Sequence, residues 1–272
     1  RLSRLCEDQP DWSTFTASTY DNPFIPRDET DTLRESMPDA VFRQEIMAAF
    51  LESDGEVFRR VDEASTLSPQ PPNPAHFYVC GVDWGRVTDY TVLSVIDVTA
   101  RQQAWLDRFT NEPFHLQRQR VIALHEHYRF GVILAESNSM GQDRIEDLQH
   151  AGLPVRPWHA TNSTKAVVID ALVLALEQGR LALLDHKEQR EELVTYSSSM
   201  TPSGLVRYSA PEGVHDDTVM ALAIAWEAAS SSAPVPPPRP YSNAFGMNRD
   251  PATNAERELV AVRAAFDKWG KR

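Results

Sequence analysis

The sequence predicts an α/β domain with a mixed sheet, in which an antiparallel meander comes first, parallel strands follow, and helices flank the sheet. Three observations predict this fold class. Apolar runs at residues 77–83, 91–98 and 104–110 follow one another across short turns, as in a meander. Strand-like and helix-like segments then alternate from residue 113, which favours parallel strands joined by helices. Hydrophobic residues make up 42% of the 272-residue chain, so it can form a buried core.

The elements after the meander are indicated by hydrophobic period and by turn residues. Leu116, Val121 and Leu124 recur at helical spacing, and the short apolar run GVILA follows them. Gly179 ends a long apolar helix, and the turn TPSG precedes the last strand. In chain order we expect a helix over 113–129, a strand over 131–135, a helix over 141–150, a strand over 155–158, helices over 163–178 and 190–198, a strand over 205–209 and a helix over 214–229.

Two proline-rich segments divide the chain into three regions. The strings STLSPQPPNP at residues 65–74 and SSSAPVPPPRP at residues 230–240 cannot continue a helix or a central strand. We therefore expect a linker segment over 1–75, the α/β domain over 76–232 and a tail over 233–272.

Two helices are expected outside the α/β domain. Residues 39–52 (DAVFRQEIMAAFLE) repeat apolar side chains at helical spacing. In the tail, residues 256–269 place Leu259, Val262 and Phe266 on one helical face. That tail helix either packs on its own domain or docks on a partner protein.

Charge and cysteine content limit the function classes. The net charge of −12 is awkward for DNA binding, because phosphate contacts need Lys and Arg; we expect a weak grip on DNA without metal ions or a partner. The two cysteines, Cys6 and Cys80, lack CxxC spacing, which argues against a disulfide scaffold and a zinc site and fits a reducing cytoplasm. No apolar run reaches the roughly 18 residues of a membrane helix. The start of the chain lacks the apolar core of a signal peptide.

Acidic residues stand where strands end and where a helix begins. Asp83 ends the first strand, Glu136 ends the GVILA strand, and Asp216 and Asp217 open the last helix. Two-metal hydrolysis of a phosphodiester needs three or four carboxylates converging on ions about 4 Å apart. Mg and Mn prefer oxygen ligands. The pattern therefore predicts a site for two divalent cations, Mg or Mn, and Asp89, in the turn before the second strand, lies within reach of it.

Each acid also has a structural interpretation. Asp83 can cap a turn, and Asp89 can be a solvated turn residue. One of Asp216 and Asp217 can cap the last helix, so both stay candidates and Asp217 is the preferred ligand.

Three further residues are candidates for DNA contact. Lys165 lies at the start of a helix, Arg207 lies on the strand after the TPSG turn, and His215 precedes the two acids. The alternative for each of them is an exposed or packing role.

The strings GVDWGRVTDYTVLSV, VILAESNSMGQD and GVHDDTVMALAIA resemble the nuclease motifs of the large terminase subunit of tailed bacteriophages. The resemblance covers most of residues 76–230. Upstream, ASTYDNPFIP and FRQEIMAAFLESDGEVF look like the segment that joins that family's packaging ATPase to its C-terminal nuclease domain. Any one string is a weak signal, whereas three in order at suitable spacing are a strong one.

The resemblance implies a ribonuclease H-like fold, dependence on Mg or Mn, and cutting of concatemeric double-stranded DNA in the host cell cytoplasm during phage assembly. It places the catalytic acids on Asp83, Glu136 and Asp217, with Asp216 beside the last and Asp89 as an accessory acid. The portal protein and the small terminase subunit are the implied partners, with no membrane. The ATPase's GxxxxGK[ST] phosphate loop is absent from the sequence, so we expect a nuclease fragment of a longer protein.

Three other function classes fit parts of the sequence. A junction resolvase or a transposase shares the fold and the acids but has no reason to carry the NPFIP and FRQE segments. An ATP-binding domain of the actin or sugar-kinase type needs a second glycine-rich phosphate loop, which the sequence lacks. A non-catalytic portal-docking module has no need of the acids, all of which are present. The metal-dependent endonuclease is therefore the preferred prediction.

Overall fold

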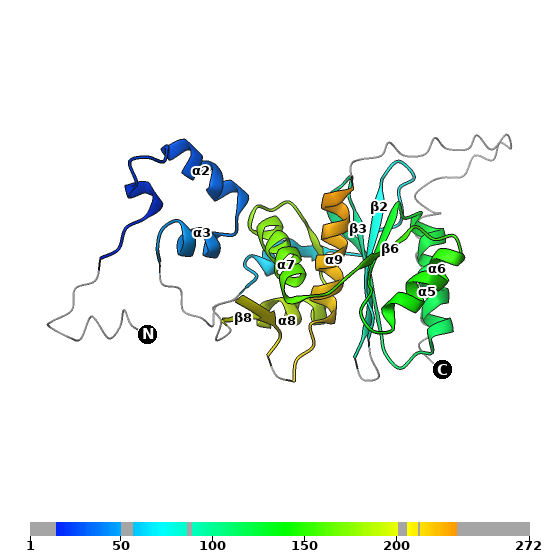
Figure 1. Ribbon diagram of the computed structural model, residues 1–272. Helices are drawn as coiled ribbons and strands as arrows, with labels where there is room; N and C mark the ends of the chain where they lie inside the picture. The colour runs from blue at the N-terminus through cyan, green and yellow to red at the C-terminus, as the bar shows by residue number, and fades with distance from the viewer. Residues whose placement is uncertain (1–14, 50–56, 86–88, 201–205, 212, 233–272) are drawn as a thin grey trace. The chain divides into compact units, whose positions relative to one another are not determined.

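The computed structural model describes residues 15–49, 57–85, 89–200, 206–211 and 213–232 (Figure 1). The chain divides into two compact units, one ending at Gly55 and the other beginning at Glu56. This division falls before the expected boundary at residue 75. The reason is that the segment between the two positions packs with the second unit, as described below.

The first unit is helical. A proline stands immediately before each of its α-helices, where the missing amide hydrogen costs no helical hydrogen bond. The Thr19 amide donates to the Ile46 carbonyl at 2.7 Å and joins the start of the unit to its last helix. The helix expected over 39–52 begins as predicted but ends at Glu45, and residues 50–52 lie outside the described part. The elements are η1 (Thr19–Asp21), α2 (Arg27–Ser36) and α3 (Asp39–Glu45).

The second unit is built on a five-stranded sheet. Its strand order is β4-β3-β2-β5-β6. The strands β2, β3 and β4 form two antiparallel pairs, whereas β5 pairs in parallel with β2 on one side and with β6 on the other. The meander followed by parallel strands is therefore confirmed. The strands are β2 (Tyr78–Asp83), β3 (Thr91–Asp97), β4 (Gln102–Phe109), β5 (Val132–Glu136) and β6 (Val155–Trp158).

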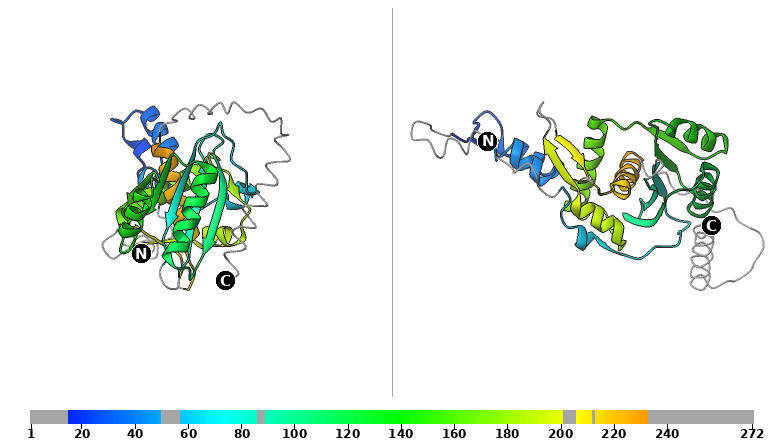
Figure 2. Two further views of the ribbon diagram at one scale, coloured as in Figure 1. Left: turned by 90° about the vertical axis from the view of Figure 1, so that its right-hand side faces the viewer. Right: turned by 90° about the horizontal axis from the view of Figure 1, so that it is seen from below.

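Helices cover both faces of this sheet, as Figures 1 and 2 show. Two of them, α5 (Phe114–Tyr128) and α6 (Gly141–His150), lie on one face. The other face is covered by α7 (Asn162–Glu177) and α9 (Asp217–Ser231), with α8 (Lys187–Thr195) packed against α9.

The two faces of β2 belong to two separate cores, because side chains alternate along a strand. Val79 packs with the α7 and α9 side, while Cys80 and Val82 pack with the α5 and α6 side. Gly81 faces α9 so closely that a Cβ atom there would collide with the backbone of Ala221 and Ala225. The absence of a side chain at Gly81 thus lets α9 lie directly on β2.

The proline-rich segment 65–74 is not a free linker. It starts with β1 (Ser65–Leu67), which pairs in parallel with β7 (Leu183–Leu184). The Gln70 amide donates to Ala104 at 3.0 Å, and the Tyr128 hydroxyl donates to the Gln70 carbonyl at 2.6 Å. Proline excludes a helix or a central strand, but it allows an extended segment fastened through its other residues. The linker interpretation of these residues was therefore wrong.

The helix expected over 190–198 is displaced. It is α8, Lys187–Thr195, and the serines after it form β8 (Ser197–Met200), which pairs antiparallel with β9 (Val206–Ser209). Serine competes with the helical backbone for hydrogen bonds, so a run of serines ends a helix readily. The single turn α4 (Val61–Ala64) was not predicted.

Two further predictions concern membrane-spanning helices and the helix of the C-terminal tail. None of the helices among the described residues is long and apolar enough to cross a membrane. The helix expected over 256–269 lies outside the described residues.

Candidate metal centre

Two of the predicted acids end neighbouring parallel strands. Val82 of β2 pairs with Ala135 of β5, so the next residues, Asp83 and Glu136, leave the sheet side by side. The two carboxyl groups are hydrogen-bonded to each other, and Asp83 is only 9% exposed. This contact confirms that the first and second acidic motifs meet.

The third acidic motif reaches the same place from the first turn of α9. Asp217 is the first residue of α9, and Asp216 is its N-cap residue. The charges of both act on Asp83. The close packing of α9 on Gly81, two residues before Asp83, explains how a helix start from the far end of the chain reaches the end of β2.

The acids in this cluster oppose one another's ionisation. Burial raises the pKa of Asp83 well above its usual range, and Glu136, Asp217 and Asp216 raise it further. Burial also raises the pKa of Asp217 to about 6, although a hydrogen bond from the Tyr90 amide at 3.2 Å acts in the opposite direction. A bound cation stabilises crowded carboxylates of this kind, because it favours their ionised forms and offsets their mutual repulsion.

One lysine of the chain partly neutralises the cluster. Lys165 Nζ donates to Asp216 Oδ2 at 2.8 Å, with both side chains partly exposed. Lys165 is therefore not the freely exposed lysine of the structural alternative. Lys165 lies beside the acids, and its role as a DNA contact stays a prediction.

The donor chemistry fits hard divalent cations, since Asp83, Glu136, Asp216 and Asp217 offer carboxylate oxygens. Within the described part of the chain, no three His, Cys, Asp or Glu side chains stand ready to hold a metal ion as they are placed. The reason is visible in the partners: Asp216 is turned to Lys165, and the acids at the strand ends are turned to each other.

A buried glutamate that sequence reasoning missed fixes the start of α9. Glu192 of α8 is 5% exposed, and its Oε2 accepts hydrogen bonds from the Thr218 amide at 2.8 Å and the Thr218 hydroxyl at 2.5 Å. It acts as a cap supplied by another helix, and Thr218 is the residue next to Asp217. Glu192 is distinguished only by its contact with Thr218, 26 residues along the chain, so no local sequence pattern could have predicted its role.

Arg108 and the rings of Tyr90 and His215 also pack around the start of α9. Arg108 lies 3.6 Å from Glu192 Oε1 and sits over the Tyr90 ring, 3.3 Å from its centroid. Tyr90 in turn meets the His215 ring edge-on, with centroids 5.3 Å apart. His215 Nδ1 lies 3.5 Å from Asp217 Oδ2, so His215 is brought to the site as its position in the sequence suggested.

Among the described residues, no contact brings Asp89 or Arg207 into the cluster. Asp89 is held in the turn before β3, where its carbonyl accepts from the Thr110 hydroxyl at 3.1 Å. Its carboxylate is not among the main influences on the pKa of Asp83 or Asp217. Arg207 is exposed on β9, in the β8–β9 pair. Both assignments stay predictions.

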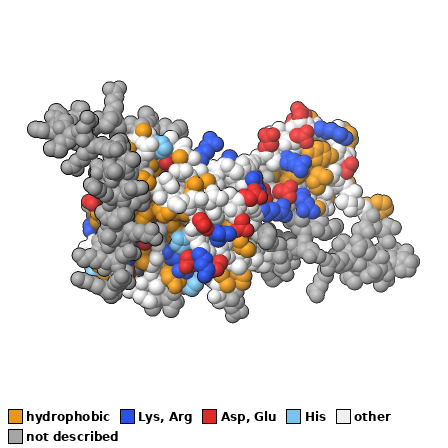
Figure 3. Space-filling model, turned by 180° about the vertical axis from the view of Figure 1, so that it is seen from behind, with side chains coloured by type: hydrophobic (Ala, Val, Ile, Leu, Met, Phe, Trp, Pro, Cys, Tyr) orange, Lys and Arg blue, Asp and Glu red, His pale blue; other side chains and the backbone are white. Residues whose placement is uncertain are grey.

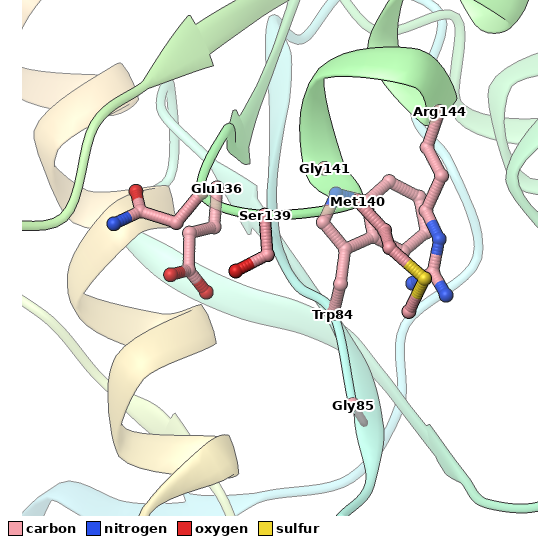
Figure 4. Close-up of a pocket in the computed structure, with 8 residues that line it drawn as sticks. Trp84, Gly85, Glu136, Ser139, Met140, Gly141 and Arg144 are labelled. Carbon is pink, nitrogen blue, oxygen red and sulfur yellow. The ribbon is translucent and has the colours of Figure 1, made fainter. Parts of the chain in front are cut away.

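A pocket of about 320 Å³ opens beside Glu136 (Figure 4). The turn after β5 forms one wall, with Ser139 in a left-handed conformation (φ 55°) and Asn138 hydrogen-bonded to the Ala160 backbone. Gly141 is required here, because a Cβ atom would strike the Glu136 carbonyl oxygen. The lining residues are Trp84, Gly85, Glu136, Asn138, Ser139, Met140, Gly141 and Arg144.

Comparison with known proteins agrees with this geometry. The family model for the terminase RNaseH-like domain matches residues 80–228, which is more than half of the chain and contains all four clustered acids. The large terminase subunits of Thermus phage G20c and Thermus virus P23-45 are each 30% identical over 234 residues. That alignment takes in 82% of this chain but 48% of either relative. The chain thus spans about half the length of the curated relatives that it matches.

Solved structures give the same result. The large terminase nuclease from thermophilic phage G20c with bound magnesium superposes with a TM-score of 0.59 at 30% identity, covering 63% of this chain and 96% of that one. The same nuclease has been solved with bound cobalt and with bound zinc. The sheet order, the flanking helices and these similarities identify the fold as ribonuclease H-like, and the chain belongs to the family of terminase RNase H-like nuclease domains.

Proposed function

We propose that this chain is the metal-dependent endonuclease domain of a viral DNA-packaging terminase and that it cuts concatemeric double-stranded DNA. The observation that carries the proposal is the meeting of acids from β2, β5 and α9 around a buried Asp83 whose pKa is raised. An acidic cluster with this electrostatic conflict is typical of a site that binds cations. The magnesium-bound G20c nuclease supports a divalent metal.

The residues have distinct roles in this proposal. Asp83, Glu136 and Asp217 hold two divalent cations, Mg or Mn, while Asp216 and Asp89 assist. Bound cations at such a site supply activation of the attacking water and stabilisation of the leaving oxygen. The chain's own part is to fix the ligands: β2 and β5 hold two of them rigidly, and Glu192 holds the α9 backbone through Thr218.

DNA contact is assigned to Lys165, His215 and Arg207. Lys165 and His215 already lie beside the acids, so each can meet a phosphate that approaches the cluster. On the face seen in Figure 3, acidic and basic side chains of the described residues are interspersed. This distribution supports a weak intrinsic grip on DNA, with binding strengthened by cations at the site.

The whole terminase sets the partners and the place of action. We assign this chain to the host cell cytoplasm during phage assembly, with the portal protein and the small terminase subunit as partners. The family match and the acids together favour this function over a junction resolvase, a transposase or a non-catalytic docking module.

Cleavage of supercoiled plasmid tests the proposal. The wild-type chain should nick or linearise plasmid with Mg or Mn, and EDTA should stop it. Asp83→Ala and Glu136→Ala should each reduce the rate by at least a hundredfold, on the order of 3 kcal/mol of transition-state stabilisation. Glu126→Ala removes an exposed acid of α5 and should cut like the wild type. Undiminished cleavage by Asp83→Ala would refute the assignment.

A further inference from the structure

The pocket beside Glu136 has a cationic wall that the acidic cluster does not use. Arg144 of α6 lines it together with Trp84 and Glu136. In Figure 4, Glu136 and Ser139 lie on one side of the pocket residues, and the Arg144 guanidinium lies on the other, next to the Trp84 ring. The pocket therefore has an acidic end, at the candidate metal centre, and a basic end.

Arg144 is partly buried, and no carboxylate in the described residues pairs with it. Burial lowers its pKa, and no acid opposes that effect. The contrast with Arg118 on the neighbouring α5 is direct, because Arg118 donates to Asp147 Oδ2 at 2.6 Å. A guanidinium taken partly out of water without an acidic partner is a costly arrangement unless an anion binds there.

Two aromatic rings hold the Arg144 guanidinium in place. Its central carbon lies 5.1 Å from the Trp84 ring centroid and 5.4 Å from that of Phe114. The two rings contact each other edge-on, 6.3 Å apart. Stacking on aromatic faces compensates part of the lost hydration and limits the rotamers of the arginine. No acceptor among the described residues takes a hydrogen bond from this guanidinium, so its donors can meet a ligand.

Trp84 adds an independent observation. It is 8% exposed, and its indole N–H finds no hydrogen-bond partner among the described residues. Trp84 directly follows Asp83, so the ring that contacts Arg144 is fixed to the end of β2, where the central acid lies. The basic Arg144, the aromatic Trp84 and the acidic Glu136 thus line one cavity.

We propose that Arg144, supported by Trp84 and Phe114, binds a backbone phosphate of the DNA in this pocket, on the α6 side of the acidic cluster. The guanidinium fork matches two phosphate oxygens, which a lysine cannot do. The inference rests on the proposed function, because a DNA strand bound for cleavage at the acidic cluster would pass this pocket. Arg144 would position the strand and would not take part in the bond-breaking step.

Salt-dependent DNA binding tests this inference without relying on cleavage. The full chain, with Ca²⁺ in place of Mg, is titrated against a short fluorescent duplex at several NaCl concentrations. Arg144→Ala should weaken binding by about tenfold. It should also make the negative slope of log K against log salt shallower by about 0.9, the value of one phosphate contact. Arg144→Lys keeps the charge and should retain most of the slope with reduced affinity. Arg156→Ala, which removes an exposed arginine of β6, should leave both quantities unchanged.

The outcomes separate the possible failures. Equal slopes for wild type and Arg144→Ala, or an equal loss in Arg156→Ala, would overturn the inference. Should Arg144→Ala fail to fold by circular dichroism, Arg144→Gln takes its place with the same expectation. Binding that depends on Arg144 in a chain that never cuts DNA with Mg or Mn would refute the proposed function alone, whereas a chain that neither binds nor cuts would refute both. Competition by millimolar inorganic phosphate, with no loss of duplex affinity in Arg144→Ala, would show a site for the free ion and would also overturn the proposal.

Discussion

Two acidic groups of the central sheet, Asp83 on β2 and Asp107 on β4, have opposite electrostatic surroundings. At the end of β2, Asp83 meets other acids, and each of its named influences raises its pKa. On β4, Asp107 is also buried, but Arg120 lies 3.2 Å away and lowers the pKa that burial raises. The difference agrees with the proposal that Asp83 belongs to a cation site, whereas Asp107 belongs to a closed structural network with Arg120.

Arg120 is buried because two carboxylates, those of Asp107 and Glu112, accept its hydrogen bonds. Arg120 is 3% exposed, and Glu112 receives a second bond from it at 2.6 Å. Among the clustered acids that the structure describes, Lys165 pairs with Asp216 alone, and both side chains stay partly exposed. The chain thus supplies a complete counter-charge at one place and an incomplete one at the other.

The largest expected effect separates the two regions by stability. Arg120→Ala leaves Asp107 and Glu112 buried without their cation, so it should lower the free energy of unfolding by roughly 3–5 kcal/mol. Urea denaturation measures this value. Arg156→Ala, at an exposed position of β6, should change it by less than about 0.5 kcal/mol. Equal effects of the two substitutions would break the comparison.

Asp83 should behave in the opposite way. Asp83→Ala should leave the melting temperature of the metal-free protein unchanged or slightly raised, because it removes one of several crowded carboxylates. Addition of Mn should raise the melting temperature of the wild type and have little effect on the variant. A marked fall in the metal-free melting temperature would show that Asp83 is a structural acid like Asp107.

The pH dependence of stability sharpens the same contrast. The folded pKa of Asp217 is raised to about 6, above the roughly 3.9 of an unfolded aspartate, so the folded state binds the proton more tightly. Acidification of the metal-free wild type from pH 7 towards pH 4.5 should therefore stabilise it relative to Asp217→Asn. Thermal melts of both proteins across this range give the difference, and a difference that is flat or reversed would contradict the electrostatic account.

The smallest effect concerns the support of α9. Glu192→Ala removes the acceptor for the Thr218 amide and hydroxyl and should cost about 1–2 kcal/mol of stability, as loss of a helix cap does. Glu192→Gln keeps one oxygen acceptor and should cost less. Plasmid cleavage by Glu192→Gln should fall only severalfold, and a complete loss would place Glu192 among the ligands instead.

The fold was predictable where strand-like and helix-like hydrophobic patterns follow one another clearly along the sequence. The meander and the parallel strands follow from apolar runs and turns, and the three acidic motifs follow from their places at strand ends and at a helix start. The two-residue strand β7 was not predictable, because so short an element is defined by its pairing partner alone. The fastened proline-rich segment was missed for the same reason, since its bonds to Ala104 and Tyr128 span long stretches of chain.

The site was predictable only in part. Asp83, Glu136, Asp216 and Asp217 carry local signals, whereas Glu192 and Arg144 acquire their roles through contacts that only the folded chain creates. Neither residue differs, by its sequence neighbours, from an ordinary charged residue on a helix surface.

Manganese titration followed by electron paramagnetic resonance tests the central claim most directly. The wild-type chain should bind two Mn²⁺ ions, Asp83→Asn and Glu136→Gln should each lose at least one, and Glu126→Gln should bind as the wild type does. Wild-type stoichiometry and affinity in Asp83→Asn, or no binding by the wild type, would contradict the account.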